Sequence, residues 1–127
     1  MTTPADTLSG KRILVVEDEY LIASLIVTVL TRAGCVVVGP FSTLAIALEA
    51  ARTEDVDTAL LDVNLAGQFV FPVAEVLDQR HIPFLLLTGY GENAIPDDHR
   101  DWKVVSKPFR PQRLLTALLD SMLIAHR

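Results

Sequence analysis

Cysteine is nearly absent from this sequence, in which one of 127 residues, Cys35, carries a thiol. A disulfide bond within the chain is therefore excluded, and so is a small fold that depends on disulfide bonds. Long apolar runs are absent too, since the longest, residues 21–30, is interrupted by Ser24 and Thr28. A membrane-spanning helix needs about 20 apolar residues, so the sequence predicts no membrane association.

Basic residues are fewer than acidic residues. Against 16 aspartate and glutamate residues stand 11 lysine and arginine residues, which gives a formal net charge of -5. A nucleic-acid binder would carry a basic surface, so we expect no direct contact with nucleic acid. Residues 1–9 contain Pro4 and Asp6 and lack the basic and apolar regions of a secretory signal. We therefore expect a cytoplasmic protein with a reduced Cys35.

Apolar residues are abundant, at 50% of the chain against 21% charged residues. This composition differs strongly from that of a disordered protein, and the length suits a single domain with one hydrophobic core. We predict a flexible N-terminal segment at residues 1–10 and one folded domain at residues 11–127.

Short apolar runs alternate with longer segments of helical periodicity. This alternation is typical of βαβ units and predicts an α/β fold, a doubly wound, five-stranded parallel sheet with helices on both faces. Residues 89–101 contain two glycines and a proline, so a mobile loop with at most a short fourth helix is expected there. The five strands, each apolar enough to be covered on both faces, are residues 12–17, 35–39, 58–62, 83–87 and 102–106.

Polar residues stand where four of these strands end. In a parallel α/β sheet the carboxyl ends meet at one edge, where ligands bind. Carboxylates gathered there repel one another unless a divalent cation compensates, and Mg²⁺ prefers such oxygen ligands. Each residue alone is commonly a helix cap or a surface charge, but together they predict one site. They are Glu17 and Asp18 after the first strand, Asp62 after the third, Thr88 after the fourth and Lys107 after the fifth.

These residue types suit phosphoryl transfer. The carboxylate of Asp62 would attack phosphorus, and the cation would offset the charge on the phosphoryl oxygens. Thr88 and Lys107 would offer a hydroxyl donor and a positive charge to the same oxygens.

Four motifs resemble the response-regulator receiver family of bacterial two-component systems, over residues 11–124. They are Ile-Leu-Val-Val-Glu-Asp-Glu at 13–19, Leu-Leu-Asp-Val-Asn-Leu at 60–65, Leu-Thr-Gly-Tyr at 87–90 and Ser-Lys-Pro-Phe at 106–109. The resemblance implies a flavodoxin-like sheet of strand order 2-1-3-4-5. It also implies that Asp62 is the phosphoacceptor, and that Glu17, Asp18, Asp62 and the backbone carbonyl of Asn64 hold Mg²⁺ or Mn²⁺.

By the same resemblance, Thr88 and Lys107 bind the phosphoryl group, and the bond between Lys107 and Pro108 is cis. The implied protein is a stand-alone signalling phosphoacceptor that catalyses only its own phosphorylation and dephosphorylation. Its donor would be a sensor histidine kinase or a histidine phosphotransfer protein, and its target another protein; a weak homodimer is compatible with this. The expected kinase-docking surface comprises Tyr20, Leu21, Ser24 and residues 108–110.

One position departs from the family. Receivers usually carry an aromatic residue three positions before the lysine, and this sequence has Val104. Residues 83–91 resemble a receiver subgroup with a Phe-Ala-Thr-Gly-type fourth strand, which characteristically lacks that aromatic. We therefore expect phosphorylation to order residues 89–101, with Tyr90, or less favourably Trp102, in the aromatic role.

Two other functions compete with this interpretation. A magnesium-dependent phosphohydrolase of the haloacid dehalogenase type also uses an aspartate nucleophile at a strand end, but it needs a second Asp two residues later as general acid. The sequence has Asn64 there, which cannot protonate a leaving group. A receiver-like adaptor that works without phosphorylation is the second alternative, although it would be expected to have lost at least one of the site residues.

Overall fold

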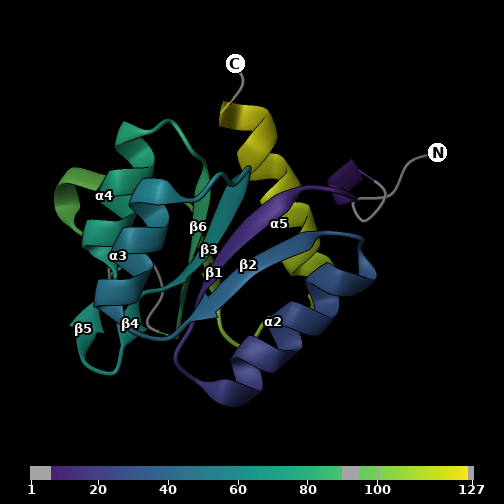
Figure 1. The fold of residues 1–127 in the computed structure, drawn as a ribbon, viewed down its shortest axis with the longest axis horizontal. Helices are drawn as coiled ribbons and strands as arrows, with labels where there is room; N and C mark the ends of the chain where they lie inside the picture. The colour runs from purple at the N-terminus through teal and green to yellow at the C-terminus, as the bar shows by residue number, and fades with distance from the viewer. Residues whose placement is uncertain (1–6, 90–94, 100, 126–127) are drawn as a thin grey trace.

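The structure, a computed structural model, describes residues 7–89, 95–99 and 101–125. Five parallel strands form one sheet in the order β2-β1-β3-β6-β7, which confirms the predicted order. Helices α2 and α5 lie on one face and α3 and α4 on the other (Figure 1). In chain order the elements are β1 (Arg12–Val16), α2 (Tyr20–Arg32), β2 (Val36–Phe41), α3 (Leu44–Thr53), β3 (Thr58–Asp62), β4 (Asn64–Leu65), β5 (Gln68–Phe69), α4 (Phe71–Gln79), β6 (Phe84–Thr88), η2 (Asp97–His99), β7 (Val104–Ser106) and α5 (Pro111–Ala125).

Two of the three inner strands, β3 and β6, carry an apolar layer on each face. Every residue of β3 and β6 is buried. Because side chains alternate along a strand, Leu61 and Leu86 pack toward α3 and α4, whereas Leu60 and Leu85 pack toward α2 and α5. Burial of each such leucine stabilises the fold by about 2 kcal/mol. The carboxyl ends of β3 and β6 are therefore held in fixed positions.

Strand β2 forms one edge of the sheet and differs from its prediction in bounds and in cover. It runs from Val36 to Phe41 rather than over residues 35–39, and Val36 is 45% exposed. The cover expected on both faces is therefore incomplete for β2: Val38 and Val37 pack on opposite faces but stay partly exposed, because an edge strand has a neighbouring strand on one side only. The register with β1 is irregular near Gly39, whose φ is 115°. A Cβ there would lie 2.7 Å from the carbonyl oxygen of Val15, so this irregularity requires glycine.

Strand β7 is shorter than predicted, Val104–Ser106 instead of residues 102–106. The ring of Trp102 stacks on His99 of η2 at 3.9 Å, so this residue packs against the preceding segment instead of extending the strand. Trp102 and Ile95 are both buried, so the described residues 95–99 and 101–102 have apolar anchors that the sequence did not suggest. Within the described part of the segment between β6 and β7, η2 is a single short turn, and Tyr90 lies outside the described residues.

The described N-terminal residues pack on the domain. Leu8 is fully buried, and the N–H of Gly10 donates to the carbonyl of Gly34 at 2.8 Å. Residues 7–10 thus contact the folded domain through Leu8 and Gly10. Cys35 is buried, and burial raises the pKa of its thiol. Among the described helices, none has the length and apolar character to span a membrane.

Candidate functional site

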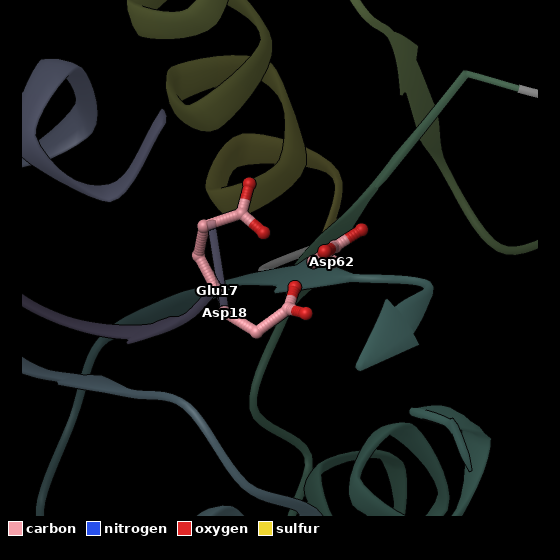
Figure 2. A group of neighbouring side chains, drawn as sticks. All are labelled: Glu17, Asp18 and Asp62. Atoms are coloured by element: carbon pink, nitrogen blue, oxygen red, sulfur yellow. The ribbon is translucent and has the colours of Figure 1, made fainter. Parts of the chain in front are cut away.

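Three carboxylates meet at the carboxyl edge of the sheet. Glu17 and Asp18 follow β1, and Asp62 ends β3, the neighbouring strand. Each offers an oxygen, and these oxygens all lie within 4.8 Å of one another (Figure 2). Glu17 and Asp62 are buried, at 2% and 5% exposure. The grouping predicted from the strand ends is therefore present in the fold.

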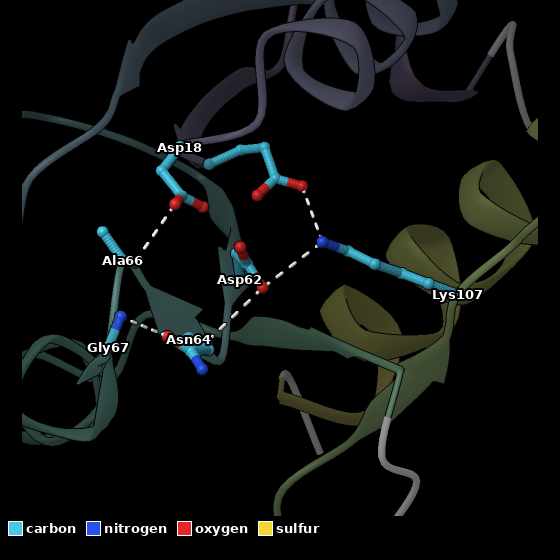
Figure 3. A network of polar contacts seen from close by, with 7 residues as sticks. Asp18, Asp62, Asn64, Ala66, Gly67 and Lys107 are labelled. Atoms are coloured by element: carbon cyan, nitrogen blue, oxygen red, sulfur yellow. Dashed lines mark hydrogen bonds and ion pairs between the residues drawn. The ribbon is translucent and has the colours of Figure 1, made fainter.

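Lys107 lies between two of these carboxylates (Figure 3). Its Nζ donates to Oε1 of Glu17 at 2.8 Å and is 3.3 Å from Oδ1 of Asp62. A backbone hydrogen bond positions the lysine after β7, since its N–H donates to the carbonyl of Thr88 at 2.9 Å. The bond between Lys107 and Pro108 is cis, as predicted. Thr88 itself is buried at the end of β6.

A small hairpin, formed by β4 and β5, forms the remaining side of the site (Figure 3). The N–H of Ala66 donates to Oδ2 of Asp18 at 3.0 Å, and the N–H of Asn64 donates to Oδ1 of Asp62 at 3.4 Å. The turn is closed by the N–H of Gly67, which donates to Oδ1 of Asn64 at 2.6 Å. Ala66 and Gly67 could not be assigned to the site from the sequence, because they contribute backbone groups and not side chains. The glycine, with its φ of 92°, was the available signal for a turn.

The electrostatics of the site favour a proton on Asp62. Burial raises the pKa of Asp62 to about 8, helped by the hydrogen bond and charge of Glu17 and by Asp18, while Lys107 opposes the shift. Burial alone would lower the pKa of Lys107, but its hydrogen bond to Glu17 and the charges of Asp62 and Glu17 outweigh burial and raise it. Within the part of the chain that the structure describes, Oε2 of Glu17 is buried without a hydrogen-bond partner. The site therefore holds more negative charge than one lysine compensates.

The predicted site residues come together around one pocket. Glu17 is not among the lining residues, but it accepts a hydrogen bond from Lys107, which lines the pocket. The lining residues are Asp18, Glu19, Asp62, Asn64, Ala66, Gly67, Thr88, Gly89 and Lys107.

Replacing Lys107 by Met is expected to lower the free energy of unfolding at pH 7 by about 3 kcal/mol, because it leaves the buried carboxylate of Glu17 without its cation. Urea denaturation measures this effect. Lys103→Met changes an exposed lysine nearby and should cost less than about 0.5 kcal/mol. Equal stabilities of the two variants would show that the Lys107 contacts do not stabilise the fold.

A doubly wound parallel sheet with acidic residues and a lysine at its carboxyl edge defines a flavodoxin-like α/β protein. Residues 13–119 match the family model described as response regulator receiver domain. The chain belongs to this family.

Several receiver-containing proteins are similar to this chain. SdrG from Sphingomonas melonis Fr1 is 37% identical with a TM-score of 0.78, and the match covers 90% of this chain and 97% of SdrG. The response regulator PhyR from Brucella abortus is 28% identical with a TM-score of 0.78, over 97% of this chain and 51% of PhyR. The transcriptional regulatory protein PdtaR from Mycobacterium tuberculosis is 28% identical over 121 residues, 92% of this chain. The match spans 59% of the length of PdtaR, so the similarity concerns the receiver part.

Proposed function

We propose that this protein is the phosphoacceptor of a two-component system or phosphorelay, and that Asp62 receives the phosphoryl group in a Mg²⁺-dependent reaction. One observation carries the proposal: the buried carboxylate of Asp62 lies 3.3 Å from Nζ of Lys107 and beside Glu17 and Asp18. A nucleophile, a cation donor and an acidic pair thus share one pocket. The protein then signals through contacts with another protein and does not turn over a substrate.

The residues present suit a divalent cation. Among the described residues, Oε2 of Glu17 has no hydrogen-bond partner, and burial, helped by the neighbouring carboxylates of Glu17 and Asp18, raises the pKa of Asp62 to about 8. A bound cation would attract the unpartnered oxygen of Glu17. It would also lower the pKa of Asp62, because positive charge favours the ionised carboxylate. Glu17, Asp18, Asp62 and the backbone carbonyl of Asn64 would hold Mg²⁺ or Mn²⁺. The bound cation would supply charge compensation for the phosphoryl oxygens.

The other steps of the transfer depend on the side chains of Asp62, Lys107 and Thr88. Ionised Asp62 forms a bond to phosphorus as the bond between phosphorus and the donor's imidazole nitrogen breaks, and the electron pair of that bond stays on the imidazole. The product is an acyl phosphate on Asp62. Lys107 exchanges its contact with Asp62 for a contact with the phosphoryl oxygens, and the hydroxyl of Thr88 donates to another of them.

Intact-mass analysis after incubation with acetyl phosphate tests the proposal. With Mg²⁺ the protein is expected to gain one phosphoryl group, and with a chelator none. The absence of any gain with Mg²⁺ would refute the phosphoacceptor function and favour the adaptor.

The donor is a histidine kinase or a histidine phosphotransfer protein, and we propose that it docks at the start of α2. Tyr20 and Leu21 are apolar side chains exposed by 81% and 79% beside the site, and exposed apolar groups next to a polar pocket suit an interface. Ser24 and residues 108–110 complete the surface.

Leu21→Arg is expected to slow phosphotransfer from a phosphorylated kinase of the same genome at least about tenfold, the effect of losing roughly 1.4 kcal/mol at an interface. Labelling by acetyl phosphate should stay normal, since it needs no docking. Leu123→Arg is the matched control, because Leu123 is 59% exposed on α5. If both variants accept the phosphoryl group at the wild-type rate, the donor docks elsewhere.

A further inference from the structure

Four rings form a continuous row that begins beside the acidic site. Phe69 of β5 stacks on Phe71 with ring centres 5.4 Å apart. Phe71 lies 6.2 Å from Trp102, and Trp102 stacks on His99 at 3.9 Å. Contacts of this kind hold rings in specific relative positions. We call Phe69, Phe71, Trp102 and His99 the ring row.

The first ring is tied to the site through the backbone. Phe69 pairs with Asn64 across the β4–β5 hairpin. The same hairpin donates hydrogen bonds to Asp18 from Ala66 and to Asp62 from Asn64. A cation or a phosphoryl group on these carboxylates takes up oxygen lone pairs that the hairpin N–H groups now use. A change at the site therefore acts directly on the element that carries Phe69.

The last rings lie away from the pocket. Neither Trp102 nor His99 lines it, and Nε2 of His99 is 3.5 Å from Oε1 of Glu75 on α4. Among the described residues, Nε1 of Trp102 is buried and has no hydrogen-bond partner, so packing against other rings, and not a hydrogen bond at this nitrogen, holds the indole. The position of Trp102 consequently depends on the rings around it.

We infer that the β4–β5 hairpin and the ring row carry the state of the acidic site to Trp102 and η2. The inference rests on the proposed function, because it takes cation binding and phosphorylation as the change at the site. Packed side chains linked to hydrogen bonds are a physical route for such coupling. This route does not pass through Val104.

Trp102 is the single tryptophan of the sequence, so intrinsic fluorescence reports on this one ring. Mg²⁺ with beryllofluoride is expected to change the emission of the wild-type protein. Phe69→Ala alters a ring that is 57% exposed, and Phe71→Leu keeps an apolar side chain. Both variants should lose most of the emission change, while they still gain one phosphoryl group from acetyl phosphate.

Phe84→Leu is the matched control. Phe84 meets the edge of Trp102 at 5.4 Å but belongs to β6 and not to the hairpin, so the resting emission should shift while the response remains. Failure of the wild type to gain a phosphoryl group would overturn the proposed function and the inference with it. Normal labelling with unchanged wild-type emission, or a full response in both Phe69→Ala and Phe71→Leu, would overturn the inference alone.

Discussion

The Asp62→Asn protein is expected to gain no phosphoryl group from acetyl phosphate and yet to be more stable than the wild type at pH 8. Loss of labelling follows from loss of the nucleophile, because an amide does not form the acyl phosphate. The gain in stability follows from the pKa of Asp62, which burial and the neighbouring acids raise to about 8. The amide side chain resembles the protonated carboxyl that the folded site favours.

The sign of the pH dependence is fixed by this shift. Below the ordinary aspartate pKa of 3.8 the carboxyl is protonated in both the folded and the unfolded chain. Between 3.8 and about 8 the unfolded chain releases the proton while the fold retains it, so wild-type stability falls as pH rises. The amide that replaces the carboxyl does not titrate, so the advantage of Asp62→Asn should grow across this window and level off above it.

Urea denaturation in a chelator at pH 5 and pH 8 measures this advantage. We expect the excess stability of Asp62→Asn at pH 8 to exceed about 1.4 kcal/mol, the equivalent of one pKa unit. A wild type as stable as the variant at both pH values would show that the site tolerates the ionised carboxylate. Labelling that survives in Asp62→Asn would place the phosphoryl group on another residue.

Magnesium is expected to stabilise the wild-type protein strongly and the Asp18→Asn protein hardly at all. A ligand that binds only the folded state at 100 times its Kd adds about 2.7 kcal/mol to the free energy of unfolding. Asp18 supplies an oxygen within 4.8 Å of those of Glu17 and Asp62, and an amide at this position removes one negative charge from the group. The difference in unfolding free energy between excess Mg²⁺ and a chelator measures the effect.

Glu49→Gln serves as the control for this experiment. It removes one negative charge from an exposed position on α3 and leaves the acidic group intact, so it should retain the full stabilisation by Mg²⁺. If Asp18→Asn is stabilised as much as Glu49→Gln, the acidic group is not the cation site.

Strand ends could be predicted from the sequence better than local loops. The apolar run of β3 has the same bounds in the structure as in the prediction, residues 58–62, because a strand buried on both faces leaves a continuous signal. Parallel strands end at one edge, so Asp62, Thr88 and Lys107 could be brought together without coordinates. The start of β7 could not be predicted as well, because a tryptophan suits either a strand or the ring contact that Trp102 makes with His99.

The β4–β5 hairpin could not be predicted in the same way. Each strand has two residues, which is too short for any periodicity. Its contribution to the site comes from the N–H groups of Ala66 and Asn64, and every residue except proline carries such a group. Charged residues can be recognised in a sequence as candidates for a site. Backbone donors cannot, because only the fold determines which N–H groups face the site.

The edge strand β2 contains features that limit aggregation between copies of this protein. Three consecutive valines, Val36, Val37 and Val38, run along it, and such a strand at a sheet edge is a template for aggregation. Gly39 and Pro40 limit that template, because the irregular register bends the strand and proline has no N–H to offer a neighbouring molecule. Directly after this bend the carbonyl of Phe41 accepts from the N–H of Glu17 at 3.0 Å. The residue that directly follows this protected part of the edge therefore also holds the backbone of the first acid of the site in place.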